Sequence, residues 1–143
     1  MKSFFDTNVL VYPFDDDSPR KKVAVQQIFK KDNSAGYILF STQVLQELYV
    51  TLTRKTQARC TPDQAIQYLQ DLAEWPLFEV DYSAILRAAE LSRDAQLSFW
   101  DALIVVAAAR SGAARLYTED LSHGQEILGV AIVNPFHGIG EPA

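Results

Sequence analysis

Short apolar segments that alternate with longer helical patterns are the feature that most constrains the fold of this chain. Residues 2–6, 37–40, 77–80, 115–118 and 130–133 are apolar runs too short for helices, and turn or cap residues bound most of them. Stretches with helical spacing of apolar residues separate these runs. Strands that alternate with helices are typical of a parallel sheet covered by helices. We therefore expect an α/β fold with a short, mostly parallel central sheet and helices on both faces.

Helix-start residues support this alternation. Ser41 or Thr42 can cap a helix whose apolar residues recur at helical spacing and which contains Glu47. In Thr61-Pro62-Asp63, proline suits the first helical position and the acid complements the helix dipole. Ser98 opens an apolar helix that should end near Ser111. These signals predict the helices that connect the strands.

Three stretches are harder to assign. Residues 3–12 are either one long strand or a strand followed by a new element at Thr7, because periodicity cannot type short apolar runs. The helix after Pro19 is expected to reach about Lys31 and to break at residues 33–36. After Asp120 we expect a short helical turn that ends at Leu128.

Composition indicates one compact domain that spans residues 1–143, because 143 residues with 48% hydrophobic content can bury a sizeable core. The only cysteine, Cys60, cannot form an intramolecular disulfide, and no charged-then-apolar leader precedes Asp6. A cytoplasmic location is therefore expected. The longest nearly uncharged stretch, residues 102–109, is much shorter than the roughly 20 residues of a membrane span. No membrane association is expected.

The net charge of −5 argues against a protein that grips nucleic acid by bulk electrostatics. It does not exclude a nuclease, because a site that recruits divalent cations can present local positive charge on an acidic protein. Basic clusters occur at residues 20–22, at residues 30–31, and at Arg54-Lys55 with Arg59. The simplest interpretation of each cluster is a solvated helix face or helix end.

Two aspartates occupy positions where a chain normally avoids charge. Asp6 ends the apolar run Phe4-Phe5, and Asp101 lies within the apolar residues 99–106. A buried, isolated carboxylate is so costly that it must pair with a cation, take up a proton or bind a metal ion. Few cations are near these aspartates in the sequence. We therefore predict a metal ion held by acids from distant parts of the chain.

Two further acids are candidates for the same site. Asp120, like Asp6, falls at or just past the carboxyl end of an expected strand, where ligands bind in α/β folds. Glu47 lies beside the apolar stripe of its helix. Each acid also has a purely structural explanation: Asp6 and Asp120 as caps or turn formers, Asp101 in a capping box, and Glu47 as a boundary residue. However, Asp101 shares a helical face with apolar residues that should point to the core.

Convergence of the four acids would require a cation. Two carboxylates 4 Å apart repel by about 4 kcal/mol at an effective dielectric constant of 20, which folding would not tolerate without compensation. Mg²⁺ prefers oxygen ligands and is typically held by one or two carboxylates plus substrate phosphates. Such a site would hydrolyse phosphodiesters. His123 and His137 have no partner at ligand spacing, so a zinc site is not expected.

Four sequence blocks carry further information. They are Phe5-Asp6-Thr7-Asn8-Val9-Leu10, residues 41–47 around Glu47, residues 98–104 around Asp101, and residues 118–124 around Asp120 followed by residues 132–136. In this order, they resemble the PIN-domain family and, within it, the VapC-type toxin ribonucleases of bacterial toxin–antitoxin systems. The resemblance covers nearly the whole chain.

The resemblance implies a three-layer PIN-like fold and a metal-dependent endoribonuclease that prefers single-stranded RNA. It implies that Asp6 and Asp101 are the primary ligands of Mg²⁺ or Mn²⁺, and that Glu47 and Asp120 complete the site directly or through water. Thr7, Asn8 and Thr118 would donate hydrogen bonds around these ligands. The metal ion would activate water for in-line attack with a 3′-hydroxyl leaving group. The resemblance also implies a homodimer and a VapB-like antitoxin whose tail occupies the groove.

Two other functions remain open at this point. A haloacid-dehalogenase-like phosphatase also has an aspartate after its first strand, but it expects a second acid two residues later, where this chain has Asn8. No suitably placed lysine is evident. A non-catalytic binding module would use the acidic pocket only to receive a basic partner.

Overall fold

A computed structural model describes residues 1–35, 37–54 and 59–139, apart from the side chains of residues 34 and 35. In these residues, the strands form one six-stranded sheet in the order β3-β2-β1-β4-β6-β5. Five strands are parallel along this order, and β5 pairs with β6 in the antiparallel sense. The strands are β1 (Ser3–Phe5), β2 (Ile38–Ser41), β3 (Leu77–Phe78), β4 (Arg115–Tyr117), β5 (Glu126–Ile127) and β6 (Val130–Val133).

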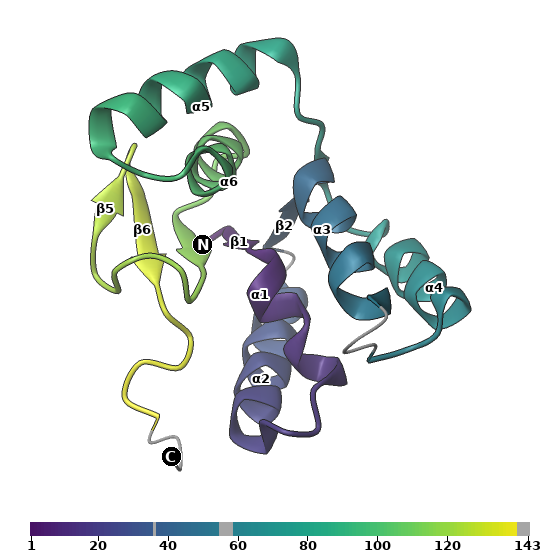
Figure 1. Cartoon of the computed structure of the whole chain (residues 1–143). Helices are drawn as coiled ribbons and strands as arrows, with labels where there is room; N and C mark the ends of the chain where they lie inside the picture. The colour runs from purple at the N-terminus through teal and green to yellow at the C-terminus, as the bar shows by residue number, and fades with distance from the viewer. Residues whose placement is uncertain (36, 55–58, 140–143) are drawn as a thin grey trace.

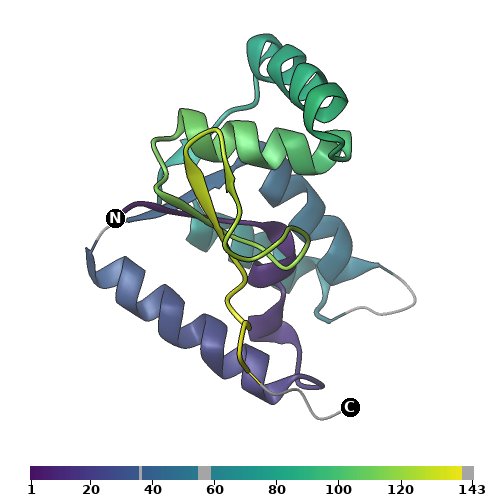
Figure 2. The ribbon, with the colours of Figure 1, turned by 90° about the vertical axis from the view of Figure 1, so that its left-hand side faces the viewer.

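Helices cover both faces of this sheet. Helix α2 (Pro19–Ala35) lies on one side, and α5 (Tyr82–Ala95) and α6 (Phe99–Arg110) lie on the other (Figures 1 and 2). The short helix α1 (Thr7–Leu10) and a 3-10 turn at Tyr12–Phe14 connect β1 to α2. Helices α3 (Thr42–Thr53) and α4 (Pro62–Leu72) pack against each other beside the sheet. The predicted α/β fold with a mostly parallel sheet is confirmed.

The strand order reverses between β1 and β4. From β1 the chain proceeds to β2 and β3 on one side, and then crosses to β4 and β6 on the other. Ser3 is paired with Arg115 and Phe5 with Tyr117, so the next residues, Asp6 and Thr118, follow the two strand ends at the same level. Ligands of α/β proteins bind at such a switch point. The sheet therefore brings Asp6 and Thr118 together at this edge.

The core is continuous from the sheet to the helices on both sides. The ring of Phe5 packs against Phe29 of α2 and Phe40 of β2, with centroids 5.4 and 6.3 Å apart. Helix α6 is buried over all of residues 102–108, because it lies between the sheet and α5. A helix enclosed in this way is apolar on all sides, as its sequence is. A charged residue in its first turn therefore requires an explanation.

Most local predictions hold. The last strand has the predicted bounds, and residues 3–12 form a strand followed by a short helix rather than one long strand. Ser41 caps α3 by accepting a hydrogen bond from the backbone N–H of Val44 at 3.3 Å. Thr61 caps α4 in a complete capping box with Gln64. None of the helices in the described part of the chain is long and apolar enough to cross a membrane.

Two predicted boundaries are wrong. Helix α2 continues to Ala35, because tertiary contacts hold the polar residues of its last turns; the Asn33 side chain accepts a hydrogen bond from the Trp75 indole at 3.1 Å. Gly36, the end of the predicted break, lies outside the described residues. The predicted helical turn up to Leu128 is instead a loop and strand β5. Leu128 and Gly129 both have positive φ, 52° and 79°, as a type I′ hairpin turn requires.

Candidate functional site

Asp6 lies at the switch point with its side chain almost fully buried. Only 6% of the residue is exposed. One carboxylate oxygen accepts a hydrogen bond from the backbone N–H of Thr7 at 2.7 Å, and the other accepts one from the Thr118 hydroxyl at 2.8 Å. No Lys, Arg or His of the described residues pairs with it. The pKa of Asp6 is raised to about 7, chiefly by burial and to a smaller extent by the charges of Asp120 and Glu47, whereas its two hydrogen bonds lower it.

The other three acids are electrostatically coupled to Asp6 or to one another. Burial raises the pKa of Glu47, and the negative charges of Asp101 and Asp120 raise it further. Burial likewise raises the pKa of Asp120, with the charge of Asp101 next in importance. Charges influence one another in this way only at short range in a partly buried site. The structure therefore places the four acids selected from the sequence within electrostatic range of one another.

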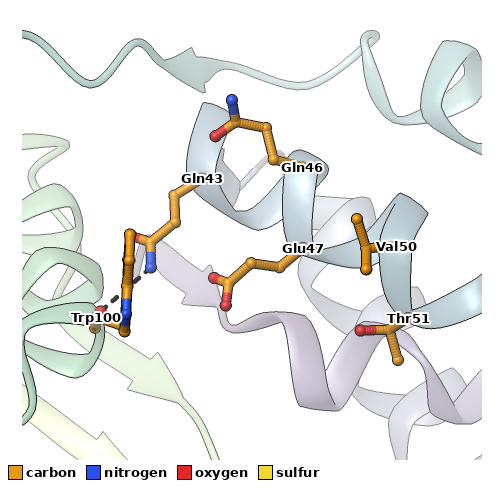
Figure 3. Close-up of a pocket in the computed structure, with 6 residues that line it drawn as sticks. All are labelled: Gln43, Gln46, Glu47, Val50, Thr51 and Trp100. Atoms are coloured by element: carbon orange, nitrogen blue, oxygen red, sulfur yellow. Dashed lines mark hydrogen bonds between the residues drawn. The ribbon is translucent and has the colours of Figure 1, made fainter.

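Each of the four acids belongs to a different element of the fold. Asp120 is in the loop after β4, where its backbone N–H donates to the Thr118 hydroxyl at 3.1 Å. Glu47 projects from the second turn of α3, on the side of α3 that faces Trp100 (Figure 3). Asp101 is in the first turn of α6. Because the end of α6 leads into the start of β4, the beginning of α6 lies at the opposite, carboxyl edge of the sheet.

The cap of α6 orients Asp101 without using its carboxylate. The Ser98 hydroxyl accepts a hydrogen bond from the backbone N–H of Asp101 at 3.1 Å. Among the described residues, the Asp101 carboxylate has no hydrogen-bond partner, so the predicted capping box is only half formed. The carboxylate is therefore available to the acidic cluster.

The three predicted donors behave differently. Thr118 donates from its hydroxyl to Asp6. The Asn8 amide donates to the Thr118 hydroxyl at 3.5 Å and lowers the pKa of Asp120, while its carbonyl oxygen is buried without a partner in the described residues. Thr7 supports Asp6 through its backbone N–H, whereas its hydroxyl donates to the carbonyl of Val44 at 3.4 Å. The side chains of Thr118 and Asn8 therefore link the acids.

A pocket of about 410 Å³ opens beside Glu47. It is lined by Gln43, Gln46, Glu47, Val50, Thr51 and Trp100 (Figure 3). Sequence reasoning missed Gln43, which is buried and donates from its amide to the backbone carbonyl of Trp100 at 3.2 Å. This bond joins α3, which carries Glu47, to α6, which carries Asp101. The sequence feature that could have identified Gln43 is its position four residues before Glu47, which places both side chains on one face of the helix.

Glu119 is adjacent to the site but is occupied by other partners. Lys21 forms an ion pair with it at 2.9 Å, and the Tyr12 hydroxyl donates to it. Burial and the hydrogen bond to Glu119 raise the pKa of Tyr12 to about 12. This network keeps the charge of Glu119 compensated. It was not predicted, because Lys21 and Glu119 are 98 positions apart.

The chemistry of the donor set suits a hard divalent cation. Four carboxylates and the unpartnered carbonyl oxygen of Asn8 are the oxygen ligands that Mg²⁺ and Mn²⁺ prefer. A cation would also compensate the mutual repulsion of the acids. As arranged, no group of three His, Cys, Asp or Glu side chains in the described residues is close enough to hold a metal ion. Metal binding by these acids therefore stays a prediction.

Comparison with known proteins identifies the family. The sequence model of the PIN domain matches residues 3–124. The chain therefore belongs to the PIN domain family. A search of the curated proteins found no match.

Similar solved structures share this fold at low sequence identity. VapC20 of Mycobacterium tuberculosis, a Sarcin-Ricin loop cleaving toxin, is 18% identical over 83% of this chain and 90% of its own, with a TM-score of 0.66. A chain of a toxin-antitoxin complex from Klebsiella pneumoniae is 19% identical over 94% of this chain and 98% of its own, with a TM-score of 0.68. A chain of DNA-bound VapBC from Salmonella typhimurium is 19% identical over 92% and 96%, with a TM-score of 0.65.

Proposed function

We propose that this chain is a metal-dependent endoribonuclease that hydrolyses RNA phosphodiesters as the toxin of a VapBC-type toxin–antitoxin pair. One observation carries the proposal: four acids from four elements lie within electrostatic range of one another at the switch point of the sheet, and the most buried of them, Asp6, has no cationic partner among the described residues. A structural role would not require such a cluster. The similarity to VapC20 and to toxin–antitoxin complexes supports the choice of RNA as the substrate and of an antitoxin as the partner.

In this proposal, Asp6 and Asp101 hold Mg²⁺, for which Mn²⁺ can substitute, and Glu47 and Asp120 contribute directly or through water. When bound, the ion lowers the pKa of a water molecule and compensates the charge of the scissile phosphate. The protein supplies orientation. Thr118 and the backbone N–H of Thr7 hold both oxygens of Asp6, and Gln43 holds α3 against α6.

The proposed partners are RNA, a VapB-like antitoxin and a second copy of the chain. Tyr82, Ile85 and Leu86 lie at helical spacing on α5 and are exposed, which supports a protein contact on this helix. An antitoxin with a basic side chain would be attracted by the acidic cluster. A toxin that cleaves RNA and is held by such an antitoxin would act in the cytoplasm.

The decisive experiment incubates purified, partner-free protein with a diverse RNA pool and Mg²⁺ or Mn²⁺, and sequences the new 5′ ends. We expect cleavage with either ion and none with a chelator. Asp6→Asn and Asp101→Asn should each abolish cleavage while the circular dichroism spectrum is unchanged. Asp71→Asn is the matched control, because Asp71 is exposed on α4 and accepts one hydrogen bond from Gln67 that asparagine can also accept. Absence of cleavage by the wild-type protein would contradict the proposal.

The same experiment separates the alternatives. A non-catalytic binding module would bind a basic partner but would cleave no RNA with either ion. A phosphatase has no support from the PIN family match, and it would require a covalent phosphate on Asp6 during turnover of a phosphomonoester.

A further inference from the structure

A second cavity adjoins the acidic cluster towards the C-terminal end of α3. Its volume is about 170 Å³, and its lining includes Asn8, Tyr12, Asp15, Thr51, Arg54 and Arg59. None of these residues except Asn8 belongs to the predicted acidic site. The cavity contains two of the three cations of the basic cluster noted in the sequence; the third, Lys55, lies outside the described residues.

Two residues connect this cavity to the acids. Asn8 lines the cavity, and its amide donates to the Thr118 hydroxyl, which in turn donates to Asp6. Thr51 lines both this cavity and the larger pocket that contains Glu47. A chain that passes the acidic cluster along α3 would therefore enter the cavity.

The cavity has a positive charge excess. The Arg59 guanidinium lies 3.7 Å from the Asp15 carboxylate, and the backbone N–H of Arg59 donates to the carbonyl of Leu52 at 2.9 Å, which holds this arginine at the end of α3. Arg54 is exposed at the same end of the helix. The described residues that line the cavity include two arginines and one carboxylate. The Thr51 hydroxyl is a further hydrogen-bond donor of the lining.

A phosphate group that binds next to the four acids requires positive charge nearby. An RNA strand brings one negative charge per nucleotide, and the four acids repel the phosphates that flank the one being cleaved. Arginine binds phosphate oxygens with two parallel hydrogen bonds and retains its charge at all relevant pH values. On a protein with a net charge of −5, cations placed beside the acids decide whether a strand can approach.

We propose that the cavity of Asn8, Thr51, Arg54 and Arg59 is a phosphate-binding subsite for single-stranded RNA. It receives a phosphate that neighbours the scissile one and so positions the strand across the acidic cluster. This inference rests on the proposed function, because it assigns a role to a cavity beside the proposed nuclease centre.

The test measures binding of a fluorescently labelled single-stranded RNA oligonucleotide by anisotropy, in the Asp101→Asn background and over a range of salt concentrations. Arg54→Gln and Arg59→Gln should each weaken binding about tenfold at 0.1 M salt. Each should also lower the slope of log affinity against log salt concentration by about 0.7, the value for one lost contact to a single strand. Arg93→Gln is the matched control, because Arg93 is exposed near the end of α5 and pairs only with its neighbour Asp94 in the described residues.

Two further variants keep the test decisive. Arg59→Lys keeps the positive charge and should therefore retain the salt slope of the wild-type protein. If Arg59→Gln weakened binding only through a folding defect, its melting temperature would fall and Arg59→Lys would not restore RNA binding. If Arg54→Gln and Arg59→Gln bind RNA like Arg93→Gln, the subsite is wrong even though the wild-type protein cleaves RNA. If a glutamate-rich peptide binds in an arginine-dependent manner and RNA binding is unaffected, the cavity takes a protein carboxylate and the proposal is overturned. Failure of the wild-type protein to cleave any RNA contradicts the proposed function separately.

Discussion

Two buried aspartates lie at opposite ends of the parallel strands, and their surroundings differ in kind. Asp32, with 4% of its surface exposed, lies near the start of β1 and β4, where Arg115 reaches its carboxylate at 3.1 Å and the Ser3 hydroxyl at 2.7 Å. Asp6, with 6% exposed, lies at the carboxyl ends of the same strands and has only uncharged donors. Other acids, rather than an arginine, surround it.

The difference separates a structural carboxylate from a candidate functional one. At Asp32 the chain supplies its own cation, so the charge is compensated in the folded protein at all times. At Asp6 the chain adds further negative charge, which is tolerable only with a proton or an external cation. Burial alone therefore identifies neither role. The presence or absence of a cation within the fold distinguishes the two sites.

The largest expected effect concerns the pair at Asp32. Arg115→Met should lower the free energy of unfolding by about 3–5 kcal/mol, because it leaves a buried carboxylate without its cation. Asp6→Asn should leave the stability of the metal-free protein at pH 7.5 unchanged or higher, because it removes a buried, uncompensated charge. Urea denaturation measures both. The double variant Asp32→Leu/Arg115→Met should regain most of the loss, and the comparison fails if Asp6→Asn is as destabilising as Arg115→Met.

The second expected effect is a pH dependence in the metal-free protein. Burial raises the pKa of Asp6 from 3.8 to about 7, so the folded state retains a proton that the unfolded state has released. Stability is therefore unaffected by this group below pH 4, falls as the pH rises from about 4 to 7, and stays low above it. The loss is at most about 4 kcal/mol. The raised pKa values of Glu47 and Asp120 act in the same direction.

Urea denaturation at a series of pH values in the presence of a chelator measures this dependence. Asp6→Asn should flatten the curve between pH 5 and 7.5, whereas Asp71→Asn should reproduce the wild-type curve. A wild-type stability that rises over this interval would show that Asp6 is compensated within the fold, as Asp32 is.

The third expected effect is stabilisation by metal ions. At a Mg²⁺ concentration 100 times the dissociation constant, binding should add about 2.7 kcal/mol to the free energy of unfolding. At one fixed Mg²⁺ concentration, the gain should be larger at pH 8 than at pH 6, because at the lower pH the ion must displace the proton of Asp6. Thermal unfolding followed by circular dichroism measures this gain. It should persist in the Asp32→Leu/Arg115→Met variant and vanish in Asp6→Asn; equal gains in all three proteins would indicate nonspecific ion binding.

The sequence was sufficient to predict the fold class and to select four acids as candidates for the site. Strand–helix alternation predicts the parallel sheet, and Asp6 and Asp101 are conspicuous because each interrupts apolar residues. These signals are local, since hydrophobic periodicity and helix caps act within a few residues. The end of α2 was predicted wrongly because a long-range contact contributes to it, the bond between Asn33 and Trp75. Strand β5 pairs with β6 in a local hairpin, and it was missed because the turn at Leu128 and Gly129 was interpreted as the end of a helix.

The partners of the charged residues could not be predicted. Asp32 and Arg115 are 83 positions apart and meet through the parallel register of β1 with β4 and the length of α2. Gln43 meets the carbonyl of Trp100 only because α3 and α6 start at the same edge of the sheet. A sequence therefore shows that a carboxylate is unusual, whereas the tertiary structure shows whether a cation accompanies it.

The smallest expected effect compares one serine at each end of the sheet. Ser98→Ala removes the cap of α6 and should cost about 1 kcal/mol of stability. Because the same hydrogen bond orients Asp101, the rate of RNA cleavage should fall about tenfold or more. A displacement of a catalytic group by 1 Å can lower a rate roughly 100-fold. Ser3→Ala removes the acceptor of the Arg115 Nε–H group at the other end and should lower stability with little effect on cleavage measured well below the melting temperature. If cleavage follows stability equally in both variants, the orientation of Asp101 has no special importance, and the acidic edge differs from the Asp32 end only in charge.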